Sequence, residues 1–168
     1  QVRYSLLSPM TTKMAKVVLV GESNVGKSSL MQRLSAGTFA SNAEATVGAA
    51  FAAVRCEIDG EQHLFQIWDV AGQPRYRALI PLYIQHAQLV LLCCDATTTQ
   101  AERDAWASEV GGCSSVVHVG TKADVAAVAG VAVQTSAKSG EGCEALRHLM
   151  ASHARRTAIT PEEQQQPS

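Results

Sequence analysis

The chain has 168 residues and a formal net charge of −1, with 46% hydrophobic and 17% charged residues. This length suits one domain with a real core, and the composition is globular rather than disordered. The near-neutral charge argues against a protein that coats nucleic acid, so no nucleic-acid partner is expected. No apolar run reaches the length of about 18 residues that a membrane span needs.

The five cysteines form no CxxC pair and have no zinc-like spacing to the five histidines. Disulfides are rare in reducing compartments, where buried cysteines behave as small hydrophobic residues. We therefore expect reduced, structural thiols in a cytosolic protein.

The first half of the chain contains an apolar run, a helical segment and two segments in which apolar and polar residues alternate. The run 15–21 predicts a buried strand, and 27–36 predicts a helix. Two alternating segments, "AAFAAVRCEIDG" and "EQHLFQIWDV", follow and are joined by Asp59 and Gly60. An Asp-Gly pair between alternating runs is a strong hairpin signal.

The second half continues the alternation. We expect a helix at 74–84, a strand at 88–94, a helix at 98–110, strands at 114–120 and 131–135, and a helix at 140–155. Apolar strands separated by helices indicate an α/β fold, here with six strands, a mostly parallel sheet and helices on both faces. We place one domain at 14–156, between a flexible leader at 1–13 and a polar tail at 157–168.

The segment "GESNVGKS" lies between the first strand and the first helix and fits the pattern G-x-x-x-x-G-K-[ST]. Its glycines allow successive N–H groups to point at phosphate oxygens, and the helix start adds its positive dipole end. Lys27 would reach the β and γ phosphates, and the Ser28 hydroxyl would bind Mg²⁺. The alternative, a glycine-rich turn with a serine cap, leaves Lys27 and the spacing unexplained.

A second signal is "IWDVAGQ", where an apolar strand ends in a carboxylate. Asp69 can hold the water shell of Mg²⁺, the N–H of Gly72 can meet a γ-phosphate, and Gln73 can orient an attacking water. The alternative is that Asp69 only ends the strand.

Two further motifs, "GTKAD" and "TSAK", follow later strands. The carboxylate of Asp124 can accept from N1 and N2 of guanine, a pair of donors that adenine lacks. The N–H of Ala137 could meet guanine O6. In open sheets ligands bind beyond the carboxyl ends of the strands, so this position suits a base. Asp124 also disfavours an ATPase or a kinase.

The ordered set GESNVGKS, Thr46, DVAGQ, TKAD and SAK resembles the Ras-superfamily small GTPases. Longer segments, such as "QIWDVAGQPRYRAL", resemble the Rab branch and especially its early-endosomal members. The resemblance implies a P-loop small-GTPase fold and a GTP/GDP switch that needs Mg²⁺, hydrolyses GTP slowly and recruits effectors when GTP orders two loops. It also implies vesicle trafficking by a cytoplasmic protein, with endosomal membranes as the candidate site of action.

The resemblance assigns roles to individual residues. Thr46 closes onto Mg²⁺ and the γ-phosphate, and Phe39 lies against the guanine. An aromatic trio that Rab proteins present to effectors corresponds to Phe51, Trp68 and Tyr83. The alternative for the trio is ordinary packing. Exchange and activating proteins are further implied partners.

The complete set of expected site residues follows from the motifs and the resemblance together. The expected catalytic residues are Gln73, Lys27 and Thr46, and the expected metal ligands are Ser28, Thr46 and Asp69. The expected nucleotide-binding residues are Gly21, Glu22, Ser23, Asn24, Val25, Gly26, Lys27, Ser28, Ser29, Phe39, Gly72, Thr121, Lys122, Asp124, Ser136, Ala137 and Lys138.

Three departures from the family pattern concern single positions and the tail. Thr121 stands where asparagine is usual, although its hydroxyl can still form a hydrogen bond. Pro74 replaces the usual glutamate and should stiffen the second switch, because proline fixes φ. The tail has no terminal cysteine pair, so the lipid attachment known of Rab proteins is not expected on this chain.

The largest departure is the short segment "VAAVAG" between Asp124 and the last expected strand. Parallel strands normally need a crossover of about a dozen residues or more. Either the crossover helix is reduced to about one turn, or residues are missing from the sequence near 124–130. We expect 114–120 and 131–135 to remain neighbours, with apolar surface left uncovered beside them and in contact with a neighbouring molecule. If Pro74 or the short crossover misplaces Gln73 or the base, the alternative function is a nucleotide-binding scaffold with little or no hydrolysis.

Overall fold

The computed structural model describes residues 11–113 and 115–158. Its strands are β1 (Thr11–Val20), β2 (Ala49–Ile58), β3 (Glu61–Val70), β4 (Leu89–Cys94), β5 (Val116–Gly120), β6 (Val133–Gln134) and β7 (Arg155–Ala158). Its helices are α1 (Lys27–Ala36), the 3-10 helix η1 (Pro74–Leu79), α2 (Ile80–Ile84), α3 (Gln100–Glu109) and α4 (Cys143–Ser152). Among the described residues, no helix is long and apolar enough to cross a membrane.

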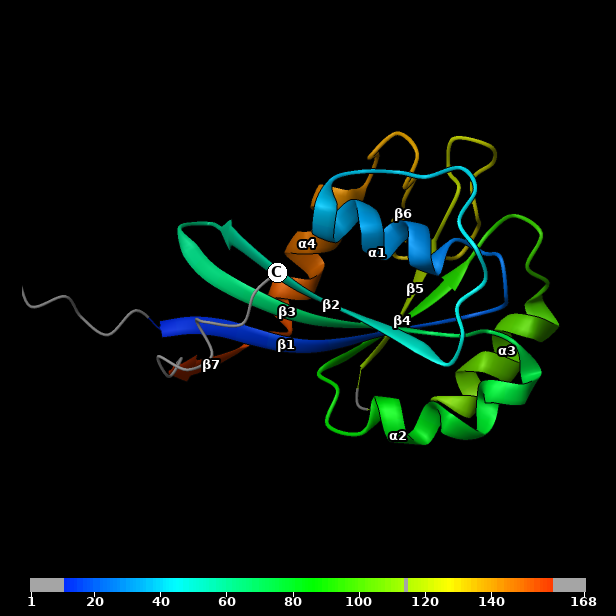
Figure 1. The fold of residues 1–168 in the computed structure, drawn as a ribbon, viewed down its shortest axis with the longest axis horizontal. Helices are drawn as coiled ribbons and strands as arrows, with labels where there is room; N and C mark the ends of the chain where they lie inside the picture. Colours follow the sequence, from blue (N-terminus) through cyan, green and yellow to red (C-terminus); the bar gives the residue numbers. More distant parts are fainter. Residues whose placement is uncertain (1–10, 114, 159–168) are drawn as a thin grey trace, which may run out of the picture.

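The strands form one sheet in the order β2-β3-β1-β4-β5-β6. The β2–β3 hairpin is antiparallel, and the other pairs along this path are parallel. Helices α1 and α4 cover one face of the sheet, and α2 and α3 cover the other (Figure 1). The expected α/β class with a mostly parallel sheet is therefore confirmed.

The seventh strand, β7, differs from the expected six-stranded sheet. The helix expected at 140–155 ends at Ser152, and β7 then pairs antiparallel with the first residues of β1, from Thr11 to Met14. Strand β4 pairs with β1 only from Val17 onward, so the earlier part of that edge of β1 can take another strand. The sheet thus includes residues of the expected leader and tail. Residues 1–10 and 159–168 lie outside the described residues.

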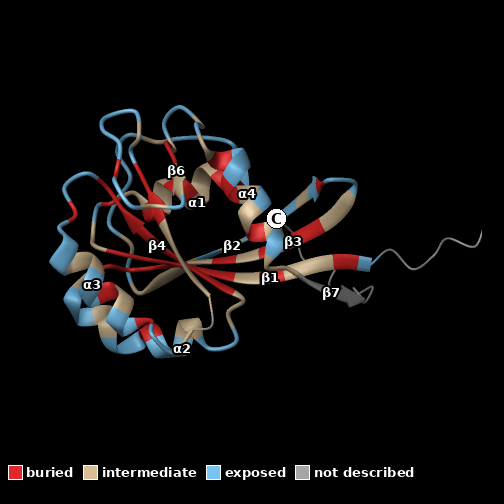
Figure 2. Ribbon diagram, turned by 180° about the vertical axis from the view of Figure 1, so that it is seen from behind, coloured by how far each residue is buried: buried red, intermediate tan, exposed pale blue. Residues whose placement is uncertain are grey.

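The core lies on both faces of the sheet, as the continuously apolar strands suggest (Figure 2). All six residues of β4 are buried. Leu91 packs with α1 and α4, whereas Leu92 faces α2 and α3. Successive side chains of a strand point to opposite faces of the sheet. A strand that is covered by helices on both faces therefore has apolar residues at every position.

Local signals explain several boundaries. Asp59 and Gly60 both have positive φ, of 52° and 78°, as the tight hairpin turn requires. Helix α3 begins after a capping box formed by Thr99 and Glu102. The helix expected at 74–84 is instead η1 followed by α2, with Pro74 in the first turn of η1.

The crossover between β5 and β6 contains no helix. The two strands are parallel neighbours, with Val119 opposite Val133, as expected. Every residue between them is described, and none is helical. The short crossover is therefore confirmed as a feature of the fold.

A side-chain amide holds this crossover against the sheet. The Oε1 atom of Gln134 accepts from the N–H of Val128 at 3.1 Å, and its Nε2 donates to the carbonyl of the same residue. Gly120 leaves room for this amide, because a Cβ there would lie 2.5 Å from Gln134 Oε1. Val128 is buried, whereas Val125 and the alanines at 126, 127 and 129 are exposed, so part of the uncovered apolar surface expected here is present. Contact with a neighbouring molecule stays a prediction.

All five cysteines lie in the described ranges and are free. Cys93 and Cys94 are both buried. Burial raises the pKa of the Cys93 thiol to about 12, which keeps it protonated and unreactive at neutral pH.

Candidate functional site

A cavity of about 370 Å³ lies where the expected motifs meet. Its size is in the usual range for a small-molecule pocket. The expected residues that line it are Ser23, Asn24, Gly26, Lys27, Ser28, Ser29, Phe39, Thr46, Gly72, Gln73, Thr121, Lys122, Asp124, Ala137 and Lys138. Four of the residues expected to bind nucleotide do not line it: Gly21, Glu22, Val25 and Ser136. The structure thus brings together motifs that lie far apart in the sequence.

The loop 21–28 wraps around the buried ammonium of Lys27. Its Nζ donates to the carbonyls of Gly21 at 2.9 Å and Glu22 at 2.7 Å. Gly21 has φ 144°, and a Cβ there would lie 2.3 Å from the carbonyl oxygen of Cys93, so only glycine fits. Burial lowers the pKa of Lys27. The loop therefore holds a desolvated cation beneath its backbone, in a place where an anion would gain most from it.

Three oxygen-bearing side chains converge beside the cavity, which Ser28 and Thr46 line and Asp69 does not. The Ser28 hydroxyl lies 2.7 Å from that of Thr46 and also donates to Asp69, and the Thr46 hydroxyl donates to Asp69 Oδ2 at 3.0 Å. Asp69 is fully buried, and its Oδ1 has no hydrogen-bond partner within the described part of the chain. Magnesium prefers such hard oxygen donors, and a bound ion would give Asp69 Oδ1 the partner that a buried carboxylate oxygen normally has. The three expected metal ligands therefore form a set that fits Mg²⁺.

The end of β3 brings Gly72 and Gln73 against the loop 21–28. A Cβ on Gly72 would lie 2.4 Å from the carbonyl oxygen of Gly21, so a side chain is excluded there. Gln73 precedes η1 and lines the cavity, where its Oε1 accepts from Arg75 Nε at 3.0 Å. The expected water-orienting amide is thus at the cavity, and its oxygen is bonded to Arg75.

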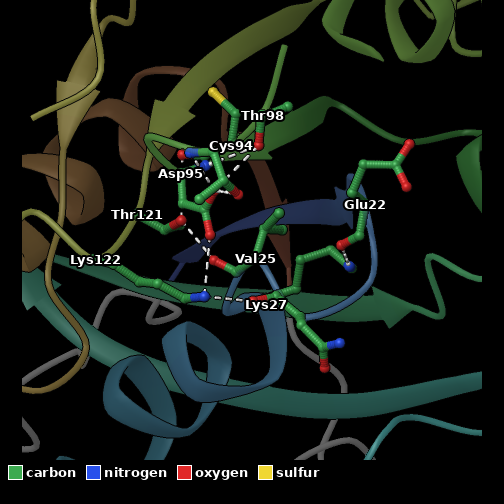
Figure 3. Close-up of polar contacts among 10 residues, drawn as sticks. Glu22, Val25, Lys27, Cys94, Asp95, Thr98, Thr121 and Lys122 are labelled. Carbon is green, nitrogen blue, oxygen red and sulfur yellow. Dashed lines mark hydrogen bonds and ion pairs between the residues drawn. The ribbon is translucent and has the colours of Figure 1, made fainter. Parts of the chain in front are cut away.

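The motif TKAD connects the end of β5 to the loop 21–28 (Figure 3). The buried Thr121 hydroxyl lies 2.5 Å from the carbonyl oxygen of Val25 and 3.2 Å from that of Cys94. Lys122 Nζ donates to the carbonyl of Asn24 at 2.5 Å and pairs with Asp95 at 3.0 Å. The hydroxyl of Thr121 does form hydrogen bonds, as expected for a residue in the place of asparagine.

Asp124 lines the cavity at the other end and is exposed. The buried Ser136 hydroxyl donates to its Oδ1 at 2.6 Å. This hydrogen bond holds the pKa of the Asp124 carboxyl below its ordinary value. Asp124 is therefore an oriented, ionised acceptor at neutral pH. Ser136 acts behind it and does not line the cavity.

A polar cluster links the loop 21–28 to η1 and α3. Glu22, expected to bind nucleotide, points its side chain away from the cavity, and its Oε1 accepts from Arg77 Nη2 at 2.9 Å and from Trp106 Nε1 at 2.8 Å. The Arg77 guanidinium also lies 4.6 Å from the centre of the Trp106 ring. Sequence reasoning missed this cluster, because its members lie 55 and 84 positions from Glu22 and no local spacing joins them.

The expected aromatic trio forms a chain of contacts. The ring centres of Phe51 and Trp68 are 4.9 Å apart, and those of Trp68 and Tyr83 are 5.6 Å apart. Phe51 is 48% exposed, and Leu82 beside Tyr83 in the sequence is 66% exposed. The trio therefore both packs internally and leaves apolar surface open to solvent.

Comparison with known proteins finds relatives that all belong to one family. A model of the Ras family matches residues 16–162. The GTP-binding protein YPT53 of Saccharomyces cerevisiae is 41% identical over 116 residues, which cover 66% of this chain and 53% of that protein. The Ras-related protein Rab-18 of Lymnaea stagnalis is 40% identical over 97 residues, which cover 56% of this chain and 48% of that protein. The chain thus spans about half the length of the curated relatives it matches.

Proposed function

Because the chain belongs to the Ras family and resembles its Rab members, we propose that it is a switch that binds GTP and GDP and hydrolyses GTP. The observation that carries the proposal is a single cavity with a buried lysine, three converging oxygen donors and an oriented carboxylate. The lysine and the oxygen donors suit a nucleotide's phosphates and their metal ion, and the carboxylate suits its base.

The phosphate end of the cavity would supply positioning and charge. Lys27 would leave the carbonyls that it now contacts and bind the β and γ phosphates. Ser28, Thr46 and Asp69 would hold Mg²⁺, which when bound would supply positive charge that stabilises these phosphates. The N–H of Gly72 would donate to the γ-phosphate.

Hydrolysis would proceed by in-line attack of water on the γ-phosphorus, with GDP as the leaving group. Gln73 would orient that water after releasing Arg75. The segment 21–28 contains no arginine, so the loop supplies none to the transition state. An arginine from an activating protein would raise the rate by about 10³–10⁵. Turnover by the protein alone should therefore be slow.

The base end of the cavity would select guanine. Asp124 would accept from N1 and N2, the N–H of Ala137 would meet O6, and Phe39 would lie along the ring. The ionised state of Asp124 suits this role, because a carboxylate that accepts two donors must not carry a proton.

The same proposal includes protein partners and a cellular role. Phe51, Trp68 and Tyr83 would meet effectors when GTP orders the segments around Thr46 and Gln73. Exposed apolar surface of this kind is common at interaction sites. Exchange and activating proteins, vesicle trafficking, a cytoplasmic location and endosomal membranes complete the proposal, which rests on the family and not on a contact in this structure.

A second candidate is a nucleotide-binding scaffold that hardly hydrolyses GTP. The bond between Gln73 and Arg75 favours it, together with Pro74, which restricts the backbone immediately after the glutamine. In this case the nucleotide would bind with the same contacts, and the water would lack its orienting group.

A single-turnover hydrolysis assay on protein loaded with GTP and Mg²⁺ separates the two. We expect measurable turnover that Gln73→Leu slows by about tenfold or more, with GTP affinity nearly unchanged, because the amide acts on the water. Gln62→Leu, on β3 away from the cavity, is the matched control and should keep the wild-type rate. Negligible wild-type turnover that Gln73→Leu does not change would favour the scaffold.

A further inference from the structure

Arg33 on α1 reaches across to the loop that carries the motif SAK. Its Nε donates to the carbonyl of Ala137 at 2.6 Å, and its Nη2 donates to that of Lys138 at 2.8 Å. Its Nη1 donates to the carbonyl of Gly37, just after α1, at 2.7 Å. One guanidinium thus joins three backbone carbonyls from two segments about a hundred positions apart.

The contacts of Arg33 complete the orientation of one backbone N–H group. The peptide before Ala137 is held because the carbonyl of Ser136 accepts from the N–H of Gly140 at 2.8 Å. The peptide after Ala137 is held because its carbonyl accepts from Arg33. The N–H of Ala137 lies in the first of these planar peptides, and the bond from Arg33 restrains the second, so Ala137 is held on both sides at the end of the cavity that it lines.

Arg33 also anchors the segment that leads to Phe39. Gly37 closes α1 in a left-handed conformation, with φ 68°, and its N–H bonds to the carbonyl of Arg33 at 3.0 Å. Arg33 therefore contacts both peptides that flank Gly37, one through its own carbonyl and the other through its Nη1. Phe39 follows two positions later and lines the cavity. The same side chain thus restrains both segments that flank the base end.

We propose that Arg33 is a positioning residue for guanine recognition, which fixes the Ala137 N–H so that it donates to O6 of the base. This inference rests on the proposed function. Arg33 itself does not line the cavity, so it acts through the loop and not on the nucleotide. A planar guanidinium can direct separate N–H groups at three acceptors, whereas the single ammonium of lysine cannot hold the same fork.

The test compares GDP with 6-thio-GDP, which keeps the N1 and N2 donors and replaces O6 by sulfur, a weaker acceptor. Dissociation constants are measured for the wild type, Arg33→Ala and Arg33→Lys in Mg²⁺ buffer. Arg147→Ala is the matched control, because Arg147 also donates to a carbonyl near the end of α1, that of Leu34, at 3.3 Å.

The wild type should prefer GDP, and Arg33→Ala should reduce the ratio of the two dissociation constants by about fivefold, the value of one hydrogen bond. Arg33→Lys should lose most of the same discrimination, and Arg147→Ala should keep the wild-type ratio. If Arg33→Ala does not fold, Arg33→Lys gives the same readout.

Two outcomes would overturn the inference, and they differ from each other. An unchanged ratio in the Arg33 variants, with GDP still bound, would show that Arg33 only stabilises the fold and would leave the proposed function intact. A wild-type protein that binds neither GDP nor 6-thio-GDP would overturn the proposed function itself.

Discussion

The lysine at the phosphate end of the cavity is buried and bonded within its own motif, whereas the carboxylate at the base end is exposed and held by a residue from elsewhere. Lys27 is 5% exposed and contacts carbonyls only six and five positions away. Asp124 is exposed and follows β5 on a crossover without a helix, where Ser136 orients it from beyond β6. The difference suggests that the two ends respond differently to substitution.

The backbone of the loop 21–28 itself sets the position of Lys27. Substitutions at the phosphate end should therefore act directly on the nucleotide or its metal ion. The base end lacks a packed crossover helix, and remote side chains take over part of its support. Gln134 and Arg33 are two such residues. The predictions below test this contrast, in order of decreasing expected effect.

Asp124→Asn should lower GTP affinity by about a hundredfold or more, because two donors of the base would lose a charged acceptor. The variant should gain affinity for XTP, whose O2 can accept from the new amide. Competition binding with GTP, XTP and ATP measures this shift. Asp59→Asn, at the hairpin turn, is the control and should change nothing. Equal wild-type affinity for ATP and GTP would mean that TKAD does not select the base.

Ser28→Asn should weaken the response to Mg²⁺ and favour GDP over GTP by about tenfold, because a hydroxyl is lost from the set that fits the metal ion. The rates of GDP and GTP release, measured at a series of Mg²⁺ concentrations, test both effects. Ser35→Asn, near the other end of α1, is the control. An unchanged Mg²⁺ dependence would show that Ser28 does not bind the metal ion and only forms part of the first turn of α1.

Gln134→Leu should lower the free energy of unfolding by about 1–3 kcal/mol, because the N–H and carbonyl of buried Val128 would lose their partner. Denaturant unfolding measures the loss. GTP affinity should fall by no more than about threefold, since the crossover only supports the base end. Gln100→Leu, which loses an exposed bond on α3, is the control. A variant as stable as the wild type would show that the crossover does not depend on this amide.

Much of the fold could be predicted because its signals are local. Helix α1 has the predicted bounds, and the hairpin turn lies at the predicted pair. The cavity also brings together most of the predicted site residues, since strands of a parallel sheet end at one edge. The prediction that depended on the chain ends was wrong, because strand β7 was missed.

The amino-acid sequence by itself determined the glycine-rich loop 21–28, the order of strands and helices from β1 to α4, and the lack of room for a full helix before β6. These features depend on neighbouring residues, on the period of apolar positions and on chain length. Only the tertiary structure decided the partners of Glu22, the pairing of β7 with β1, and the contacts of Gln134 and Arg33. A polar side chain can reach many partners from its place in the sequence, and the packing of distant elements decides which of them lies within hydrogen-bond distance.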